Sequence, residues 1–129
     1  MVVFHEANIR RTIWATVPFN FVAALAFGFP TSWLGRLFEL PDAHVMYRAF
    51  VGFLVALFGV MYAWLAAQRV IHRRLLTLGA AGKIGVFVIA VTLFLADSVS
   101  LPIVAAASGD FALGSLWLAW MRLDNHAST

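Results

Sequence analysis

Four apolar runs, each close to the length of a membrane span, dominate this sequence and limit what it can fold into. We expect these runs at about residues 12–29, 44–67, 75–99 and 102–121. A helix of about 20 apolar residues crosses the roughly 30 Å hydrocarbon core of a bilayer. Hydrophobic residues make up 63% of the 129-residue chain, and charged residues only 12%, about half the share in a soluble domain. The runs therefore predict an all-α, integral membrane four-helix bundle that takes up residues 1–129 as a single domain.

The residue types that are missing exclude several chemistries. The chain has no cysteine, which excludes a disulfide framework, thiolate catalysis, iron–sulfur ligation and cysteine-based zinc sites. No two of its four histidines have ligand spacing within a run, so we expect no metal site. No GxSxG, HExxH or phosphate-loop motif is present. We therefore predict no catalytic residue and no cofactor.

The positions of lysine and arginine predict the orientation. Seven of the nine basic residues fall on one side of the predicted membrane: Arg10, Arg11, Arg69, Arg73, Arg74, Lys83 and Arg122. Only Arg36 and Arg48 fall on the other side. The positive-inside rule then predicts a multi-pass protein of the bacterial inner membrane with both termini in the cytoplasm. Because the basic residues lie between apolar runs, they indicate membrane topology rather than nucleic-acid binding.

The first run and the connection that follows it each allow two interpretations. We interpret the first run as a spanning helix rather than a cleaved signal peptide. The connection at residues 30–41 mixes apolar and aromatic residues with Arg36 and Glu39. That mixture favours a short interfacial helix on the membrane surface, with an ordinary loop carrying aromatic anchors as the alternative.

Small residues recur at helical spacing in two of the runs. The sets lie three and four residues apart: Gly52, Ala56 and Gly59 in the second run, and Ser108, Ala112 and Ser115 in the fourth. Small faces let helix backbones approach closely in lipid, where hydrophobicity adds little to helix association. We expect these two faces to pack tightly, either within the bundle or between subunits.

Polar side chains inside the apolar runs are the strongest indication of function. A charge at the bilayer centre costs about 2.5–3.5 kcal/mol on insertion scales, so such residues face the interior, pair, or contact a ligand. We predict an outward-opening pocket in which Arg48 anchors an anion or carbonyl and Asp110 or Asp97 lies opposite. The alternative is a purely structural ion pair between Arg48 and one of these two aspartates.

Four further residues complete the predicted ligand-binding set. These are Asn20, Tyr47, Tyr62 and His44. His44 lies four positions before Arg48 and on the same helix face. For Asn20 the alternative is an interhelical hydrogen bond, and for Asp97 a solvated position at the membrane boundary. We expect Lys83 to extend toward lipid phosphates.

Short motifs distributed over residues 14–121 connect the chain to a family. They are Phe19-Asn20, Pro30, Gly35, Leu40-Pro41, Tyr47-Arg48, Gly52, Gly59, Tyr62, Leu78-Gly79, Gly82-Lys83 and Gly109-Asp110. In these motifs the chain resembles the small four-span bacterial membrane proteins grouped as DoxX-like. The resemblance implies a four-helix bundle. Because some DoxX relatives are subunits of membrane redox complexes that deliver electrons to quinone, it also implies a partner or quinone-pocket role.

These observations predict a non-enzymatic membrane protein. It would bind a lipid- or quinone-like amphiphile between its helices, or act as an accessory subunit of a larger membrane complex or as a homo-oligomer. One alternative is a small proton-coupled multidrug-type transporter that uses Asp97 or Asp110. The other is an intramembrane isomerase-like enzyme in which a paired aspartate and arginine act with Tyr47 and Tyr62 as acid and base.

Overall fold

The chain folds into helices throughout. The computed structural model describes residues 5–127, with side chains as far as residue 125, and the rest of the predicted 1–129 domain lies outside this description. Within these residues it contains five helices and no strand: α1 (Glu6–Gly28), α2 (Trp33–Leu37), α3 (Val45–Ala67), α4 (Arg73–Leu95) and α5 (Leu101–Ala127). The all-α prediction is confirmed, and a short helix is present in the connection after the first run.

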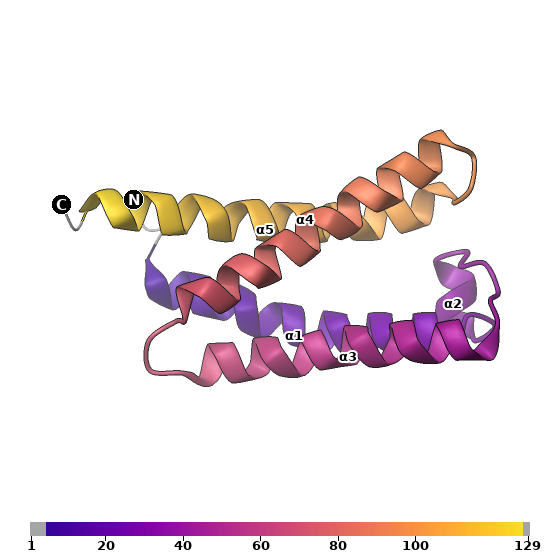
Figure 1. Cartoon of the computed structure of the whole chain (residues 1–129), viewed down its shortest axis with the longest axis horizontal. Helices are drawn as coiled ribbons and strands as arrows, with labels where there is room; N and C mark the ends of the chain where they lie inside the picture. The colour runs from indigo at the N-terminus through magenta and orange to yellow at the C-terminus, as the bar shows by residue number, and fades with distance from the viewer. Residues whose placement is uncertain (1–4, 128–129) are drawn as a thin grey trace.

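The four long helices form two hairpins (Figure 1). α1 packs most extensively on α3, and α4 on α5. The hairpins meet at the end where α1 begins and α5 finishes, and they separate toward α2 and the α4–α5 turn (Figure 1). The buried core lies at the joined end and includes Ile9, Ile13, Tyr62, Leu65, Leu76 and Trp117. We call this the closed end of the bundle.

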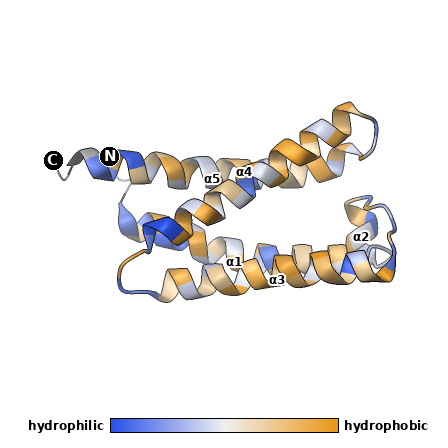
Figure 2. Cartoon of the chain, viewed as in Figure 1, coloured by the Kyte–Doolittle hydropathy of each residue, from blue (hydrophilic) through white to orange (hydrophobic). Residues whose placement is uncertain are grey.

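Three helices of the described chain are long and apolar enough to cross a membrane. They are α3, α4 and residues 101–125 of α5. Most of their residues are apolar (Figure 2), and large apolar side chains are exposed on them, with Phe53 65% and Ile89 61% exposed. Soluble proteins rarely expose apolar surface over such an area, whereas a bilayer covers it. The three helices are those of a membrane protein.

The prediction of four spans is confirmed for three helices only. α1 has 23 residues, the same length as α3 and α4, but it is not among the three. It contains Arg10, Arg11, Pro18 and Asn20, and these lower its hydropathy. The length of α1 therefore does not separate it from the three candidate spans, whereas its more polar composition does.

Local capping decides where the helices begin. The imidazole Nδ1 of His44 accepts a hydrogen bond from the backbone N–H of Met46 at 3.2 Å, so α3 begins at Val45. His72 caps α4 in the same way, with Nδ1 3.4 Å from the N atom of Leu75. A side-chain acceptor at this position satisfies one of the four free N–H groups of the first turn.

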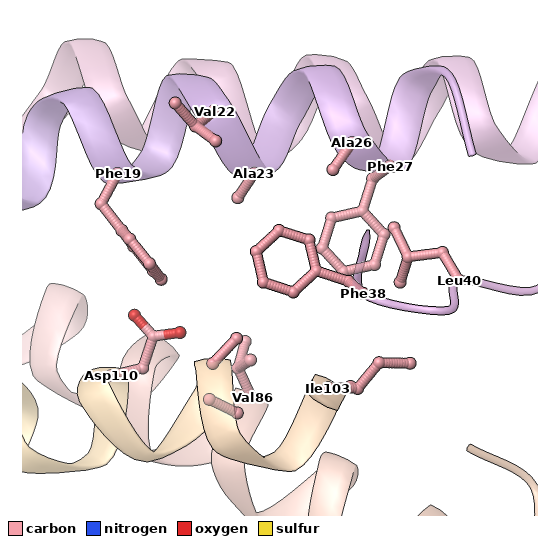
Figure 3. Close-up of a pocket in the computed structure, with 12 residues that line it drawn as sticks. Phe19, Val22, Ala23, Ala26, Phe27, Phe38, Leu40, Val86, Ile103 and Asp110 are labelled. Atoms are coloured by element: carbon pink, nitrogen blue, oxygen red, sulfur yellow. The ribbon is translucent and has the colours of Figure 1, made fainter. Parts of the chain in front are cut away.

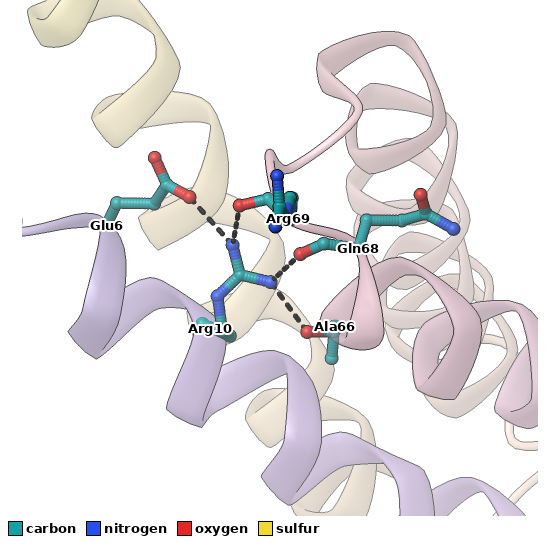
Figure 4. Close-up of polar contacts among 5 residues, drawn as sticks. All are labelled: Glu6, Arg10, Ala66, Gln68 and Arg69. Atoms are coloured by element: carbon teal, nitrogen blue, oxygen red, sulfur yellow. Dashed lines mark hydrogen bonds and ion pairs between the residues drawn. The ribbon is translucent and has the colours of Figure 1, made fainter.

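Arg10 fastens the closed end by binding the C-terminus of α3 (Figure 4). Its Nη1 donates to the carbonyl oxygens of Ala66, at 2.6 Å, and Gln68, at 2.5 Å. Its Nη2 donates to the carbonyl of Arg69, at 3.1 Å, and pairs with Glu6, at 2.8 Å. A cation at a helix C-terminus satisfies carbonyls that have no partner within the helix. Arg10 thereby holds the start of α1 against the α3–α4 connection.

Candidate functional site

An apolar cleft lies between the two hairpins and opens on two sides. One opening, of about 80 Å³, is bounded by α1, α4, α5 and the segment that follows α2. The other, of about 280 Å³, is bounded by α1, α3, α4 and α5. Both are lined by Phe19, Ala23, Phe27, Val86 and Asp110. Because they share these walls, we treat them as two openings of one cleft.

The first opening is almost wholly apolar (Figure 3). Phe38 and Leu40, which follow α2, lie across it from Ile103 of α5. Asp110 alone is charged among the twelve described residues that line it. The carboxylate of Asp110 points into the cleft toward Phe19 (Figure 3). One polar group therefore faces an otherwise hydrocarbon-like space.

Asp110 forms an ion pair with Lys83 where the cleft meets the closed end. Lys83 Nζ lies 2.5 Å from Asp110 Oδ1, and the side chains are 4% and 14% exposed. An unpaired charge in an apolar interior is very unfavourable, and pairing with good geometry offsets much of that cost. Each residue therefore makes the burial of the other tolerable.

Three aromatic rings surround the ammonium group of Lys83. Its Nζ lies 5.2 Å from the ring centroid of Tyr62 and 5.9 Å from those of Phe19 and Trp117. A cation within about 6 Å of an aromatic face is attracted by the negative potential of the ring. Rings from α1, α3 and α5 thus enclose a charge that α4 supplies.

The positions of two of these rings are fixed by hydrogen bonds at the closed end. The Tyr62 hydroxyl donates to the carbonyl of Gly79 at 3.1 Å, and a Cβ at that glycine would lie only 2.7 Å from Tyr62 Cε1. Trp117 Nε1 donates to Thr12 Oγ1 at 2.9 Å. Glycine at position 79 is therefore what lets the Tyr62 ring reach Lys83.

Asn20 and Tyr62 both border the second opening of the cleft. Asn20 is 9% exposed, and its Nδ2 donates to the carbonyl of Val55 on α3 at 3.2 Å. This is the interhelical hydrogen bond given above as the alternative for Asn20. The bond ties α1 to α3 beside the cleft.

The ion pair between Arg48 and Asp110 or Asp97, given above as the alternative to a ligand pocket, is not formed, and that hypothesis is wrong. Arg48 Nη1 lies 3.6 Å from Asp42 Oδ1, just before α3, while Asp110 pairs with Lys83. Arg48 instead borders a groove between α1 and α3 that neither Asp110 nor Asp97 lines. An aspartate and arginine placed for acid–base catalysis are therefore not brought together.

Asp97, His44 and Tyr47 also lie outside the cleft walls. Asp97 has φ 56° and lies in the turn that terminates α4. α4 ends at Leu95, four residues before the predicted end of the third run. The N–H groups of Asp97 and Ser98 donate to the carbonyls of Phe94, at 3.0 Å, and Leu93, at 2.8 Å, the pattern of a Schellman motif. His44 caps α3, and Tyr47 is 61% exposed, so all three have positions that local structure accounts for.

The two small faces lie on different neighbours. Gly52 packs on α1, where a Cβ would lie 3.1 Å from the carbonyl oxygen of Ala24, and Gly59 packs on Asn20. Ala56 lines the outer α1–α3 groove. On α5, by contrast, Ser108 and Ala112 are exposed and Ser115 is half-buried. The small face of α3 therefore lies against α1, whereas Ser108 and Ala112 of the α5 face lie at the surface, because each helix packs on its own hairpin partner.

Sequence reasoning missed Lys83 as the partner of Asp110, and it missed Phe19 and Trp117 as rings beside the Lys83 ammonium group. Lys83 was expected to extend to lipid phosphates, yet its side chain is buried. A signal was available, because Lys83 follows Leu76, Gly79 and Ala80 at helical spacing, and all three are buried. A lysine on a small, buried helix face needs an acidic partner in the interior.

Comparisons with known protein families, with curated proteins and with solved structures found no match for this chain. The cleft, with its apolar walls and its buried Lys83–Asp110 pair, is therefore the feature on which a function can be argued.

Proposed function

We propose that this chain is a membrane protein that binds a lipid- or quinone-like amphiphile in the cleft between its hairpins and does not act on it chemically. The observation that carries the proposal is the ion pair of Lys83 with Asp110, the two charged residues among the described residues that line a mostly apolar cleft. Apolar walls accommodate a hydrocarbon chain, and one polar position orients a headgroup. The larger opening, about 280 Å³, exceeds the roughly 150 Å³ of an apolar cavity known to hold benzene.

The proposal includes four spans, with α1 as the fourth, both termini in the cytoplasm of a bacterial cell, and α2 on the outer membrane surface. Support for α1 comes from its packing along α3, which satisfies the side chain of Asn20. Support for an interfacial α2 comes from Trp33 and Leu37, which are 70% and 60% exposed. The chain would serve as a free-standing protein or as an accessory subunit, and we propose from its motifs that it is DoxX-like.

Native mass spectrometry of the protein released from membranes in mild detergent tests this function. We expect a defined amphiphile adduct on the wild-type chain. The variant Ala23→Phe fills the walls common to both openings and should lose the adduct. The matched control Ala15→Phe adds the same ring to an exposed position of the same helix and should keep it. A wild-type protein without any adduct, or equal retention in both variants, would contradict binding in this cleft.

A small proton-coupled transporter is the second candidate, favoured by one observation. Asp110 is a carboxylate deep in an apolar helix, it faces the cleft, and its counterion Lys83 comes from a different helix. Buried ionisable residues of this kind often mark proton pathways in membrane proteins. Uptake into liposomes driven by a proton gradient and abolished by Asp110→Asn would favour this candidate over passive binding.

A further inference from the structure

We infer that the cleft selects an amphiphile whose head is a neutral hydroxyl group, and that this hydroxyl donates a hydrogen bond to Oδ2 of Asp110. The inference rests on the amphiphile-binding function proposed above and specifies the ligand's headgroup. It depends on a difference between the two carboxylate oxygens of Asp110: one accepts a hydrogen bond from Lys83, and the other has no partner within the part of the chain that the structure describes.

The two carboxylate oxygens of Asp110 differ in their surroundings. Oδ1 accepts from Lys83 Nζ at 2.5 Å. Oδ2 has no hydrogen-bond partner among residues 5–125, and the side chain keeps 14% of its surface exposed. Asp110 lines both openings of the cleft (Figure 3). A strong acceptor is therefore available to whatever occupies the cleft.

An anionic head does not fit this position. Its natural partner would be Lys83, but that side chain is only 4% exposed and already pairs with Asp110. The rings of Phe19 and Tyr62 lie against the same ammonium group. An anion would therefore meet the carboxylate of Asp110 first, and like charges repel strongly where water is scarce.

A cationic head is also disfavoured. One carboxylate would then face two cations, the head and Lys83, in an apolar surrounding. The second positive charge would have no counterion, because Asp110 is the one acidic residue among the described residues that line either opening. Burial of a charge without a partner is costly.

A neutral hydroxyl satisfies the site without adding charge. An O–H donor to a carboxylate forms a short, charge-assisted hydrogen bond, roughly twice as strong as one between neutral groups. An ether of the same length has no donor and would leave Oδ2 unsatisfied. The remainder of the ligand would lie along Ala23, Phe27 and Val86, which line both openings.

Competition for the cleft between chain-matched probes tests the headgroup. The protein in amphipol would be loaded with tritiated 1-dodecanol and challenged with unlabelled 1-dodecanol, dodecanoate, dodecylammonium or dodecyl methyl ether, at a pH where the acid and the amine are ionised. We expect 1-dodecanol to compete at least about tenfold better than each of the others, as one charge-assisted hydrogen bond allows. The double variant Lys83→Met/Asp110→Leu should lose this preference. The control Asp42→Asn, which removes a carboxylate outside the cleft, should keep it.

The outcomes separate the two proposals. If dodecanoate, dodecylammonium or the ether competes as well as the alcohol, the headgroup inference is overturned and amphiphile binding stands. If 1-dodecanol is not retained and no other probe binds, both are overturned. The comparison on the wild-type protein decides between these outcomes even if the double variant does not fold.

Discussion

Lys83 on α4 and Asp110 on α5 meet inside the bundle, with Nζ 2.5 Å from Oδ1, although 27 positions separate them in the chain. The other ion pairs among the described residues join side chains that are 23% to 67% exposed. This pair is therefore the one whose loss would leave a charge in an apolar interior. It also links the second hairpin to the aromatic rings of α1 and α3.

Removal of one member of the Lys83–Asp110 pair should be far more harmful than removal of both. We expect Lys83→Met and Asp110→Leu to destabilise the fold by about 3–5 kcal/mol each, because each leaves an uncompensated buried charge. The double variant should be markedly more stable than either single variant. Unfolding by denaturant in mixed micelles, analysed as a double-mutant cycle, measures this coupling. As a control, the more exposed Arg48–Asp42 pair should show a coupling below about 1 kcal/mol. Additive effects at Lys83 and Asp110 would contradict a buried pair.

Arg10 and Arg11 are adjacent, yet only Arg10 should matter for stability. Arg10→Met leaves the carbonyls of Ala66, Gln68 and Arg69 without their donor, and it should cost about 1–3 kcal/mol. Arg11 is exposed, so Arg11→Met is the matched control and should change stability little. Amide hydrogen exchange at residues 66–72 should rise in the first variant alone. Equal exchange in both variants would mean that Arg10 does not fasten the α3–α4 connection.

Two glycines of α5 should respond in opposite ways to alanine. A Cβ at Gly114 would lie 2.9 Å from the carbonyl oxygen of Ala80 and from Cγ1 of Ile84, so Gly114→Ala should push α5 away from α4. We expect a loss of about 1–3 kcal/mol, as for other overpacked sites. A Cβ at Gly109 meets nothing within 4 Å, and Gly109→Ala should gain about 0.5–1 kcal/mol of helix propensity. Thermal unfolding of the two variants checks this, and a stable Gly114→Ala protein would contradict the α4–α5 packing described above.

Asp97 should prove replaceable by glycine. Its φ of 56° lies in the left-handed region, which disfavours most side chains, and the Schellman hydrogen bonds at this turn use only its backbone. We expect Asp97→Gly to stabilise the protein by up to about 1 kcal/mol and to retain the bound amphiphile. Asp97→Val, which cannot adopt this φ without strain, should destabilise it by about 1–3 kcal/mol. Loss of the ligand in the glycine variant would restore Asp97 to the binding set.

Single cysteines in this cysteine-free chain test whether α1 crosses the membrane. All four chosen positions are exposed: Ala7 lies in the first turn of α1, Ala43 before α3, Val70 before α4 and Ser98 after α4. If four helices span, a membrane-impermeant maleimide added to intact cells should label Ala43→Cys and Ser98→Cys but not Ala7→Cys or Val70→Cys. Labelling of Ala7→Cys together with Ala43→Cys would mean that only three helices span.

The cleft shows why the residues of a site are hard to predict from a sequence even when its helices are predicted correctly. Arg48 and Asp110 both interrupt apolar runs, and their pairing was a reasonable expectation for charges in lipid. The expected pairing requires α3 and α5 to lie side by side at the level of Arg48 and Asp110. α3 packs mainly on α1 and α5 on α4, and α3 and α5 meet at Tyr62 and Trp117 in the closed end instead. For Asn20 the alternative of an interhelical hydrogen bond is confirmed, because such a bond needs only a carbonyl on the adjacent helix, and Val55 supplies it.

The sequence by itself determined where helices form and that three of them are able to span a membrane, because run length, hydropathy and capping are local properties of a chain. His44, His72 and Asp97 set helix ends through contacts with residues at most five positions away. The tertiary structure alone decided that Lys83 meets Asp110, that Arg48 meets Asp42, and that two hairpins separate to leave a cleft. Helices in lipid have little hydrophobic drive toward one particular neighbour, so the choice depends on close packing at positions such as Gly79 and Gly114. That packing involves residues distant in the chain, and the spacing within a single run does not encode it.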